Sequence, residues 1–162
     1  MSNTKATRAI IAAGGRPSGK LHTLMESWQS GGMVRNMEKV TGIGGLFFRA
    51  QDPAALGRWY QEHLGVSLTP SNDEDLPWWQ EAGPTAFSPF AETSEYFGNF
   101  KQVWMVNFRV RDLDAMAAQL RGAGIGIDVD PQHYPNGRFA RLHDPEGNPI
   151  ELWQPEERDA PS

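Results

Sequence analysis

The sequence contains no cysteine among its 162 residues. Disulfides, thiolate metal sites and cysteine nucleophiles are therefore excluded together. Long apolar runs are also missing, because no stretch approaches the roughly 18 residues that a membrane-spanning helix requires. These absences predict a soluble, cytoplasmic protein with no membrane partner. The length suits one domain, or two small modules that share a core.

Positive charge is scarce once the first segment of the chain has passed. Residues 1–36 carry five basic residues and one acidic residue, a net charge of +4. Residues 37–162 carry ten basic and nineteen acidic residues, a net charge of −9. Nucleic-acid phosphates bind to positively charged faces. The acidic body therefore argues against a nucleic-acid partner.

The basic head, residues 1–36, shows little sustained apolar periodicity, and we interpret it as a disordered extension. The glycine spacing in residues 14–20 resembles a phosphate-binding P-loop. However, Leu21 stands where that motif requires Ser or Thr, Pro17 stiffens the loop, and no βαβ unit follows. The basic, acid-poor composition also suits an organelle-targeting peptide, so this alternative stays open.

The acidic body contains an internal repeat at an offset of sixty residues, between residues 46–65 and residues 106–124. Such self-similarity indicates two copies of one supersecondary unit. In each copy an alternating, strand-like run changes to helical periodicity at an aspartate. The matching pairs are Phe48 and Phe108, Arg49 and Arg109, Asp52 and Asp112, Ala55 and Ala115, Leu56 and Met116, and Tyr60 and Leu120.

Each copy also carries the signals that begin and end a helix. Asp52 and Asp112 are placed as N-caps, whose side-chain oxygens accept from backbone N–H groups of the first turn. Gly65 and Gly124 suit left-handed positions after the last turn. Short strand-like runs follow both helices, so each copy reads as a βαβββ module. We expect the first module over 37–100, the second over 101–157 and a tail over 158–162.

The closing stretch "GRFARLHDPEGNPIELWQP", together with "FFRAQDPAALGRWYQEHLG" and "NFRVRDLDAMAAQLRGAGI", resembles the vicinal oxygen chelate superfamily. This superfamily includes glyoxalase-type lyases and isomerases, extradiol dioxygenases and bleomycin-resistance proteins. The resemblance covers about residues 43 to 155. It implies an α+β fold in which two βαβββ modules form a cup-shaped sheet with the helices on the outside.

Strand alternation assigns side chains to the inside of that cup, since successive residues of a strand point to opposite faces. On this basis the predicted ligand-binding residues are Phe47, Arg49, Met105, Asn107, Arg109, Phe139, Arg141 and Trp153. Two further residues on the inner face, Glu151 and His143, are the candidate catalytic residues.

The resemblance also implies where a metal would be held. Metal-using relatives place a ligand, usually His, seven residues before each capping aspartate, and a carboxylate on the last strand. The two positions are Gly45 and Met105 in this chain, so that only Glu151 remains of the set. Glycine has no side-chain donor, and a lone thioether prefers soft metals. We therefore predict no metal site and no cofactor.

Glu151 has several interpretations. A buried carboxylate needs a cation or becomes neutral, and Arg49, Arg109 or Arg141 can supply that cation in an internal ion pair. The alternatives are general acid/base catalysis, a solvated carboxylate and an unusual metal site. His143, next to Asp144, is either an oriented base or ligand, or a solvated strand end.

Two functions remain open, and whether the chain is an enzyme is left undecided. The first is a small-molecule-binding protein related to glyoxalase and bleomycin-resistance proteins, which binds an apolar or anionic organic ligand without the usual metal. The alternative is a glyoxalase- or dioxygenase-type enzyme with a displaced metal site or acid/base catalysis by Glu151. A homodimer is expected, and the aromatic segment 72–98 is a candidate ligand cover, dimer contact or satellite core.

Overall fold

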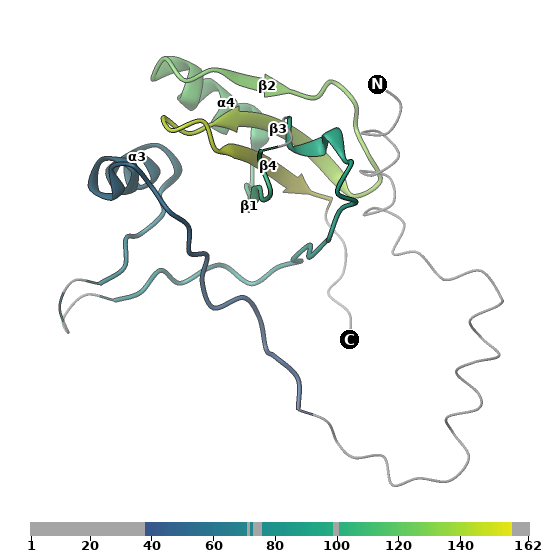
Figure 1. The fold of residues 1–162 in the computed structure, drawn as a ribbon. Helices are drawn as coiled ribbons and strands as arrows, with labels where there is room; N and C mark the ends of the chain where they lie inside the picture. Colours follow the sequence, from purple (N-terminus) through teal and green to yellow (C-terminus); the bar gives the residue numbers. More distant parts are fainter. Residues whose placement is uncertain (1–37, 71, 73–75, 99–100, 157–162) are drawn as a thin grey trace, which may run out of the picture.

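The computed structural model describes residues 38–70, 72, 76–98 and 101–156. Their regular structure is a four-stranded sheet, two α-helices and one short 3-10 helix (Figure 1). The expected α+β class is therefore confirmed. The predictions for residues 1–36 lie outside the described residues, and so does the whole of the predicted tail, residues 158–162. Within the described part, no helix is long and apolar enough to cross a bilayer.

The sheet is built entirely from the second half of the chain, in the order β1-β4-β3-β2. Strand β4 (Pro149–Pro155) lies parallel to β1 (Val106–Arg109) and antiparallel to β3 (Gly137–His143). Strand β2 (Ile127–Val129) pairs with the outer side of β3. Because β4 lies between β1 and β3, side chains from both neighbouring strands can contact the side chains of β4.

The two α-helices begin and end where the sequence predicts. Helix α3 (Pro53–Leu64) is capped by Asp52, whose Oδ1 accepts from the backbone N–H of Ala55 at 2.9 Å. Helix α4 (Leu113–Gly122) is capped by Asp112 in the same way, at 2.9 Å from the N–H of Ala115. Both predicted glycines have positive φ, 68° at Gly65 and 77° at Gly124.

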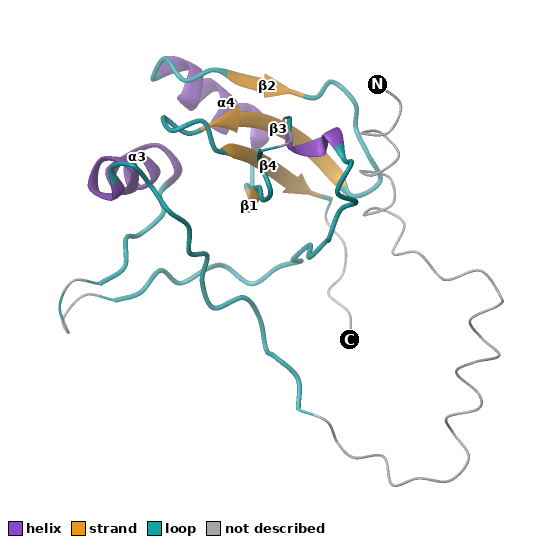
Figure 2. Ribbon diagram, viewed as in Figure 1, coloured by secondary structure: helices purple, strands orange, loops and turns teal. Residues whose placement is uncertain are grey.

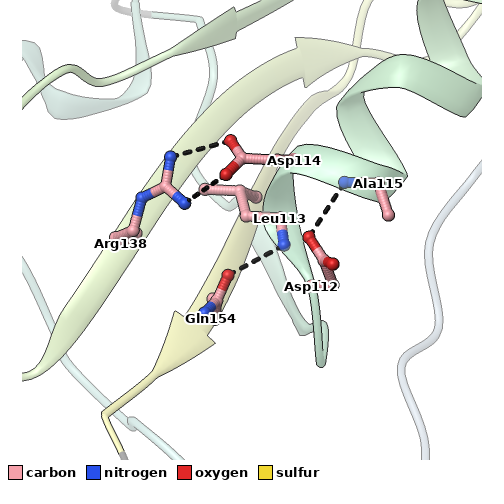
Figure 3. A network of polar contacts seen from close by, with 6 residues as sticks. All are labelled: Asp112, Leu113, Asp114, Ala115, Arg138 and Gln154. Carbon is pink, nitrogen blue, oxygen red and sulfur yellow. Dashed lines mark hydrogen bonds and ion pairs between the residues drawn. The ribbon is translucent and has the colours of Figure 1, made fainter.

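A second set of contacts ties the first turn of α4 to the sheet (Figure 3). Arg138 of β3 donates two hydrogen bonds to the carboxylate of Asp114, at 2.7 and 2.8 Å. The Leu113 N–H donates to Oε1 of Gln154 on β4 at 2.8 Å. The hydrogen bond from Arg138 holds the pKa of Asp114 below its usual value, although this carboxylate is exposed to solvent. The pair therefore orients α4 and contributes little stability.

The apolar core lies between the helices and one face of the sheet. Both halves contribute, because α3 packs against the same cluster as α4. Its fully buried members include Leu113 and Leu120 of α4 and Ile150 and Leu152 of β4. Burying such aliphatic side chains stabilises the fold at about 25 cal/mol per Å² of apolar surface. The remaining members of the cluster are Leu56, Tyr60, Ala140 and Leu142.

The turn between β3 and β4 also binds the start of α3. The carboxylate of Glu146 accepts from the backbone N–H groups of Gln51, at 2.8 and 3.0 Å, and of Asp52, at 2.9 Å. Tyr60 of α3 donates from its hydroxyl to Oδ2 of Asp144 at 3.0 Å. Burial, and then the charge of Asp144, raise the pKa of the Tyr60 hydroxyl. Residues some 90 positions apart in the chain are thus held together by carboxylates.

The first half differs from the prediction, because its described residues contain no strand. The expected strand at 46–50 and the strand-like runs at 66–68 and 77–90 are loops (Figure 2). The order strand, helix and three strands is present only over residues 106–155. An alternating pattern sets the faces of a strand but supplies no partner for its backbone. In the described part no strand pairs with the second edge of β1.

Large apolar side chains are left exposed in that first half. Those of the described residues that stay exposed all lie between Val40 and Val103. Phe47 is 93% exposed and Trp79 is 82% exposed, whereas Phe48, on the other predicted face, is 37% exposed. Phe48 packs against Trp104 with ring centroids 4.8 Å apart. Leu46, on the same predicted face as Phe48, is 51% exposed, so that face is only partly covered.

Candidate functional site

Glu151 is buried in the middle of β4, with 4% of its surface exposed. Oε1 of its carboxylate accepts from the Tyr96 hydroxyl at 2.8 Å, and Oε2 accepts from Nδ2 of Asn107 at 2.9 Å. Nε of Arg141 lies 3.5 Å from Oε1. The carboxylate therefore has two directed hydrogen bonds and one cation beside it, which is how a buried charge is stabilised.

Sheet register explains why these groups meet. Asn107 of β1 and Arg141 of β3 are the direct cross-strand partners of Glu151, one on each side. Directly opposed residues point to the same face of a sheet. Ile150 and Leu152, the neighbours of Glu151 in sequence, point to the opposite face and into the core. We call the face of Glu151 the cup face.

Tyr96 reaches the cup face from the first half of the chain. It lies in the 3-10 helix η1 (Glu95–Phe97), where Oγ of Ser94 accepts from the Tyr96 N–H at 3.2 Å. Its ring stacks on Phe90 with centroids 4.7 Å apart. On the cup side, the guanidinium carbon of Arg141 lies 4.2 Å from the centre of the Tyr96 ring. Tyr96 thus holds both Glu151 and Arg141.

Sequence reasoning did not find Tyr96. The local signal was present, because Ser94 is a capping residue and Gly98, with φ 90°, closes the short helix. Those residues predict a turn. They do not predict that the aromatic residue between them contacts a strand more than fifty residues later in the chain.

Arg141 keeps hydrogen-bonding capacity in this arrangement. Its Nε and Nη2 atoms are buried and have no hydrogen-bond partner among the described residues. The 3.5 Å separation between Nε and Glu151 is an ion pair but lacks the geometry of a directed hydrogen bond. Buried N–H groups without acceptors are costly. The arginine therefore carries two buried donors that no described residue uses.

A small pocket of about 60 Å³ opens beside Arg141. Its walls come from η1, from the residue before β1, and from the ends of β3 and β4 that meet at the turn. Most of the wall is apolar, and His143 joins it as an exposed residue. Among the residues that line it are Phe97, Met105, Arg141, His143, Pro149 and Ile150.

Asp144 does not orient His143. Its Oδ1 accepts from the backbone N–H groups of Glu146 and Asn148, each at 2.9 Å. Its Oδ2 accepts from the Asn148 side chain at 2.8 Å and from Tyr60. The buried carboxylate thus shapes the turn and binds α3. This geometry favours the interpretation of His143 as a solvated strand end.

Two of the predicted ligand-binding aromatics lie on the cup face but away from the pocket. Phe139 and Trp153 are parallel within 3°, with centroids 6.1 Å apart, and form a buried cluster with Tyr134. Nε1 of Trp153 donates to the backbone oxygen of Asn136 at 2.7 Å. Their flat faces are used in packing.

The remaining predicted residues separate into two groups. Met105 lines the pocket, and Asn107 donates to Glu151. Arg109, by contrast, donates through Nη2 to the backbone oxygen of Glu81 at 2.6 Å. Arg49 and Phe47 are exposed in the loop before α3. The structure therefore places Met105, Arg141 and His143 at the pocket. Glu151 lies beside Arg141 and is bonded by Asn107, but neither of these two residues lines the pocket.

Comparison with protein families identifies the fold. Residues 45–153 match the model of a glyoxalase-like domain. The chain belongs to this family. Its membership agrees with the vicinal oxygen chelate superfamily that the sequence resembles. The family match extends over both halves of the repeat, including the segment before α3. No curated protein matches the chain.

Solved structures give partial likenesses. A glyoxalase/bleomycin resistance protein from Streptomyces sp. CB03234 is 41% identical over 30% of this chain and 42% of its own, with a TM-score of 0.28. TnmS3, an antibiotic binding protein from the same organism, is 22% identical over 62% of this chain and 84% of its own, with a TM-score of 0.40. A glyoxylase/bleomycin resistance protein/dioxygenase domain from Frankia sp. EAN1pec is 20% identical over 73% of this chain and 100% of its own, with a TM-score of 0.46.

Proposed function

We propose that this glyoxalase-like protein binds a small organic ligand, apolar or anionic, on the cup face, without a divalent metal at Glu151. The observation that carries the proposal is the Glu151 site itself. A buried carboxylate is held by Tyr96, Asn107 and Arg141, and a largely apolar pocket is lined by two of these residues, Tyr96 and Arg141. Ligand sites commonly combine an apolar wall with a few placed polar groups.

The donors around Glu151 do not fit a divalent cation. Its carboxylate faces a hydroxyl, an amide N–H group and a guanidinium. A catalytic Zn²⁺ or Fe²⁺ needs about three protein ligands, and a neighbouring guanidinium opposes it by charge. Among the described residues no group of three or more His, Asp or Glu side chains could hold a metal. These contacts support a binding protein without the usual metal.

The enzymatic alternative has less support from the same contacts. A general base needs a lone pair directed at the substrate, and both oxygens of Glu151 already accept hydrogen bonds. His143 lacks an orienting carboxylate, because Asp144 is engaged by the turn and by Tyr60. Each oxygen keeps a second lone pair, but because only 4% of Glu151 is exposed, a substrate could reach it only if the site opened.

A cytoplasmic homodimer, with modules over 37–100 and 101–157, completes the proposal. The exposed apolar side chains between Val40 and Val103 support a dimer, because monomers rarely leave large apolar patches in water. The repeat favours a second copy of the same chain as the partner that covers this apolar surface. Residues 46–50 share the pattern of β1, and an edge strand without a partner readily accepts another strand.

Elemental analysis and native mass spectrometry of protein purified without a chelator test this function. We expect no stoichiometric metal, a dimer mass, and an unchanged metal content in Glu151→Gln. Phe47→Asp, at a 93% exposed position, is expected to shift the dimer to monomer while the folded sheet is retained. Stoichiometric Zn, Ni, Mn or Fe that is lost in Glu151→Gln would overturn the proposal of a metal-free site.

A further inference from the structure

We propose that Arg141 binds a small anionic group of the ligand, of the carboxylate class, at the pocket between η1 and the β3–β4 turn. This inference rests on the proposed ligand-binding function and makes it specific. It assigns the polar end of the ligand to one side chain. The remainder of the ligand then lies against the apolar wall of Phe97, Met105 and Pro149.

The first support is the unused donor capacity of Arg141. A guanidinium has five N–H donors in a rigid fork that matches a carboxylate. Here Nε and Nη2 are buried and have no acceptor among the described residues. A buried donor without an acceptor is unfavourable. The Arg141 side chain as a whole is 29% exposed, so a carboxylate that meets its exposed part can accept from these donors after a small rotation of the guanidinium. The same side chain lines the pocket, so an anion in the pocket is close to it.

Glu151 does not meet this need. Its Oε1 is 3.5 Å from Nε, and both of its oxygens accept shorter hydrogen bonds from Tyr96 and Asn107. The carboxylate therefore balances part of the charge on Arg141 without accepting a directed bond from it. Hydrogen bonds from an ionised donor remain strong in a partly desolvated pocket. Recognition of the ligand then depends on those directed bonds more than on net charge.

Tyr96 prepares the guanidinium for binding. The guanidinium carbon lies 4.2 Å from the centre of the Tyr96 ring, and that ring stacks on Phe90. Arginine stacked on an aromatic face loses little further freedom when its fork pairs with a planar anion. The pocket volume of about 60 Å³ limits the anion to a small group. These two features favour a planar carboxylate.

Three other arginines of the second half have acceptors. Arg138 pairs with Asp114, Arg111 pairs with Glu81, and Arg109 donates to the backbone oxygen of Glu81. Arg138 is also on β3, three residues before Arg141, but its guanidinium binds Asp114 of α4. Arg138 therefore provides a matched control of the same type on the same strand.

The test compares benzoate with benzamide, its neutral analogue of the same shape, by isothermal titration calorimetry and saturation-transfer NMR. The wild-type protein is measured beside Arg141→Gln, Arg141→Lys and Arg138→Gln. We expect wild-type protein to bind benzoate about tenfold more tightly than benzamide, the size of one charge-assisted hydrogen bond. Arg141→Gln should remove that preference, whereas Arg141→Lys should keep part of it and Arg138→Gln all of it.

Each other outcome has a distinct meaning. Equal binding of benzoate and benzamide by the wild type would overturn the anionic subsite and leave a pocket for neutral ligands. Loss of the preference in Arg138→Gln as well would assign it to general charge and overturn the role of Arg141. Binding of neither probe at millimolar concentration would overturn both this inference and the pocket as the ligand site. Retained benzamide binding shows that Arg141→Gln is folded.

Discussion

The two halves of the repeat share a sequence pattern but differ in structure. Phe108 lies in β1, and its strand pairs with β4 over four residues. Phe48, at the matching position of the first half, lies in a loop, although it also packs on aromatic neighbours. The contrast shows that a strand needs a partner edge, which its own alternating pattern does not supply.

The helices of the two halves behave in the opposite way, because both form. Helices α3 and α4 have the same aspartate cap and pack on the same core cluster. Helical hydrogen bonds join residues four apart, so the information for them is local. A local cap and an apolar stripe are therefore sufficient where a strand pattern is not.

The largest expected effect compares a buried leucine of the second half with an exposed one of the first. Leu152 is 0% exposed and Leu46 is 51% exposed. Leu152→Ala should lower the free energy of unfolding by about 2–5 kcal/mol, because it removes packed methyl groups and leaves a cavity. Leu46→Ala should change it by less than about 0.5 kcal/mol. Urea denaturation followed by circular dichroism measures both.

The same two variants should also be compared at several protein concentrations. If Leu46→Ala becomes as destabilising as Leu152→Ala at concentrations where the dimer forms, a partner covers the segment before α3. Equal effects in the monomer would contradict the exposure of Leu46.

The second prediction concerns Tyr60, which joins the halves. In the unfolded chain its hydroxyl ionises near the ordinary tyrosine pKa of 10.0, whereas burial and Asp144 raise the pKa in the folded protein. Above about pH 10 the Tyr60 hydroxyl of the unfolded state loses a proton that the folded state keeps. This contribution to stability is therefore complete below about pH 10 and decreases as the pH rises. Alkaline unfolding curves should show the decrease in the wild type.

Tyr60→Phe should weaken that alkaline decrease and lower the stability at neutral pH by about 1 kcal/mol, through loss of one hydrogen bond. Tyr134→Phe is the control, because it removes a hydroxyl that donates to Asp130 at 3.0 Å within the second half. An unchanged alkaline curve in Tyr60→Phe would show that another group causes the loss.

The smallest expected effect compares the two caps. Asp52→Ala and Asp112→Ala each leave one first-turn N–H group, of Ala55 or Ala115, without its acceptor. Each should cost about 1 kcal/mol of global stability, since both helices pack on one core. Hydrogen exchange gives the location of the change. A cost in Asp52→Ala confined to α3 would show that the first half opens independently of the sheet.

Much of the candidate site follows from sequence, because alternation placed Met105, Asn107, Arg141 and Glu151 on one face. Tyr96 does not, since its contact with Glu151 spans 55 residues and depends on the path of η1. Arg109 was assigned to the correct strand, but its side chain binds Glu81. Long side chains have several rotamers, and their partners are decided by tertiary contacts.

By itself the sequence determined the α+β class, the bounds of α3 and α4 and the face that carries Glu151. These features depend on local caps, on periodicity and on burial of apolar residues. The tertiary structure alone decided that Arg141 is the arginine beside Glu151, that Asp144 binds the turn and Tyr60, and that residues 46–50 have no strand partner. These outcomes depend on distances between segments far apart in the chain, which no local pattern encodes.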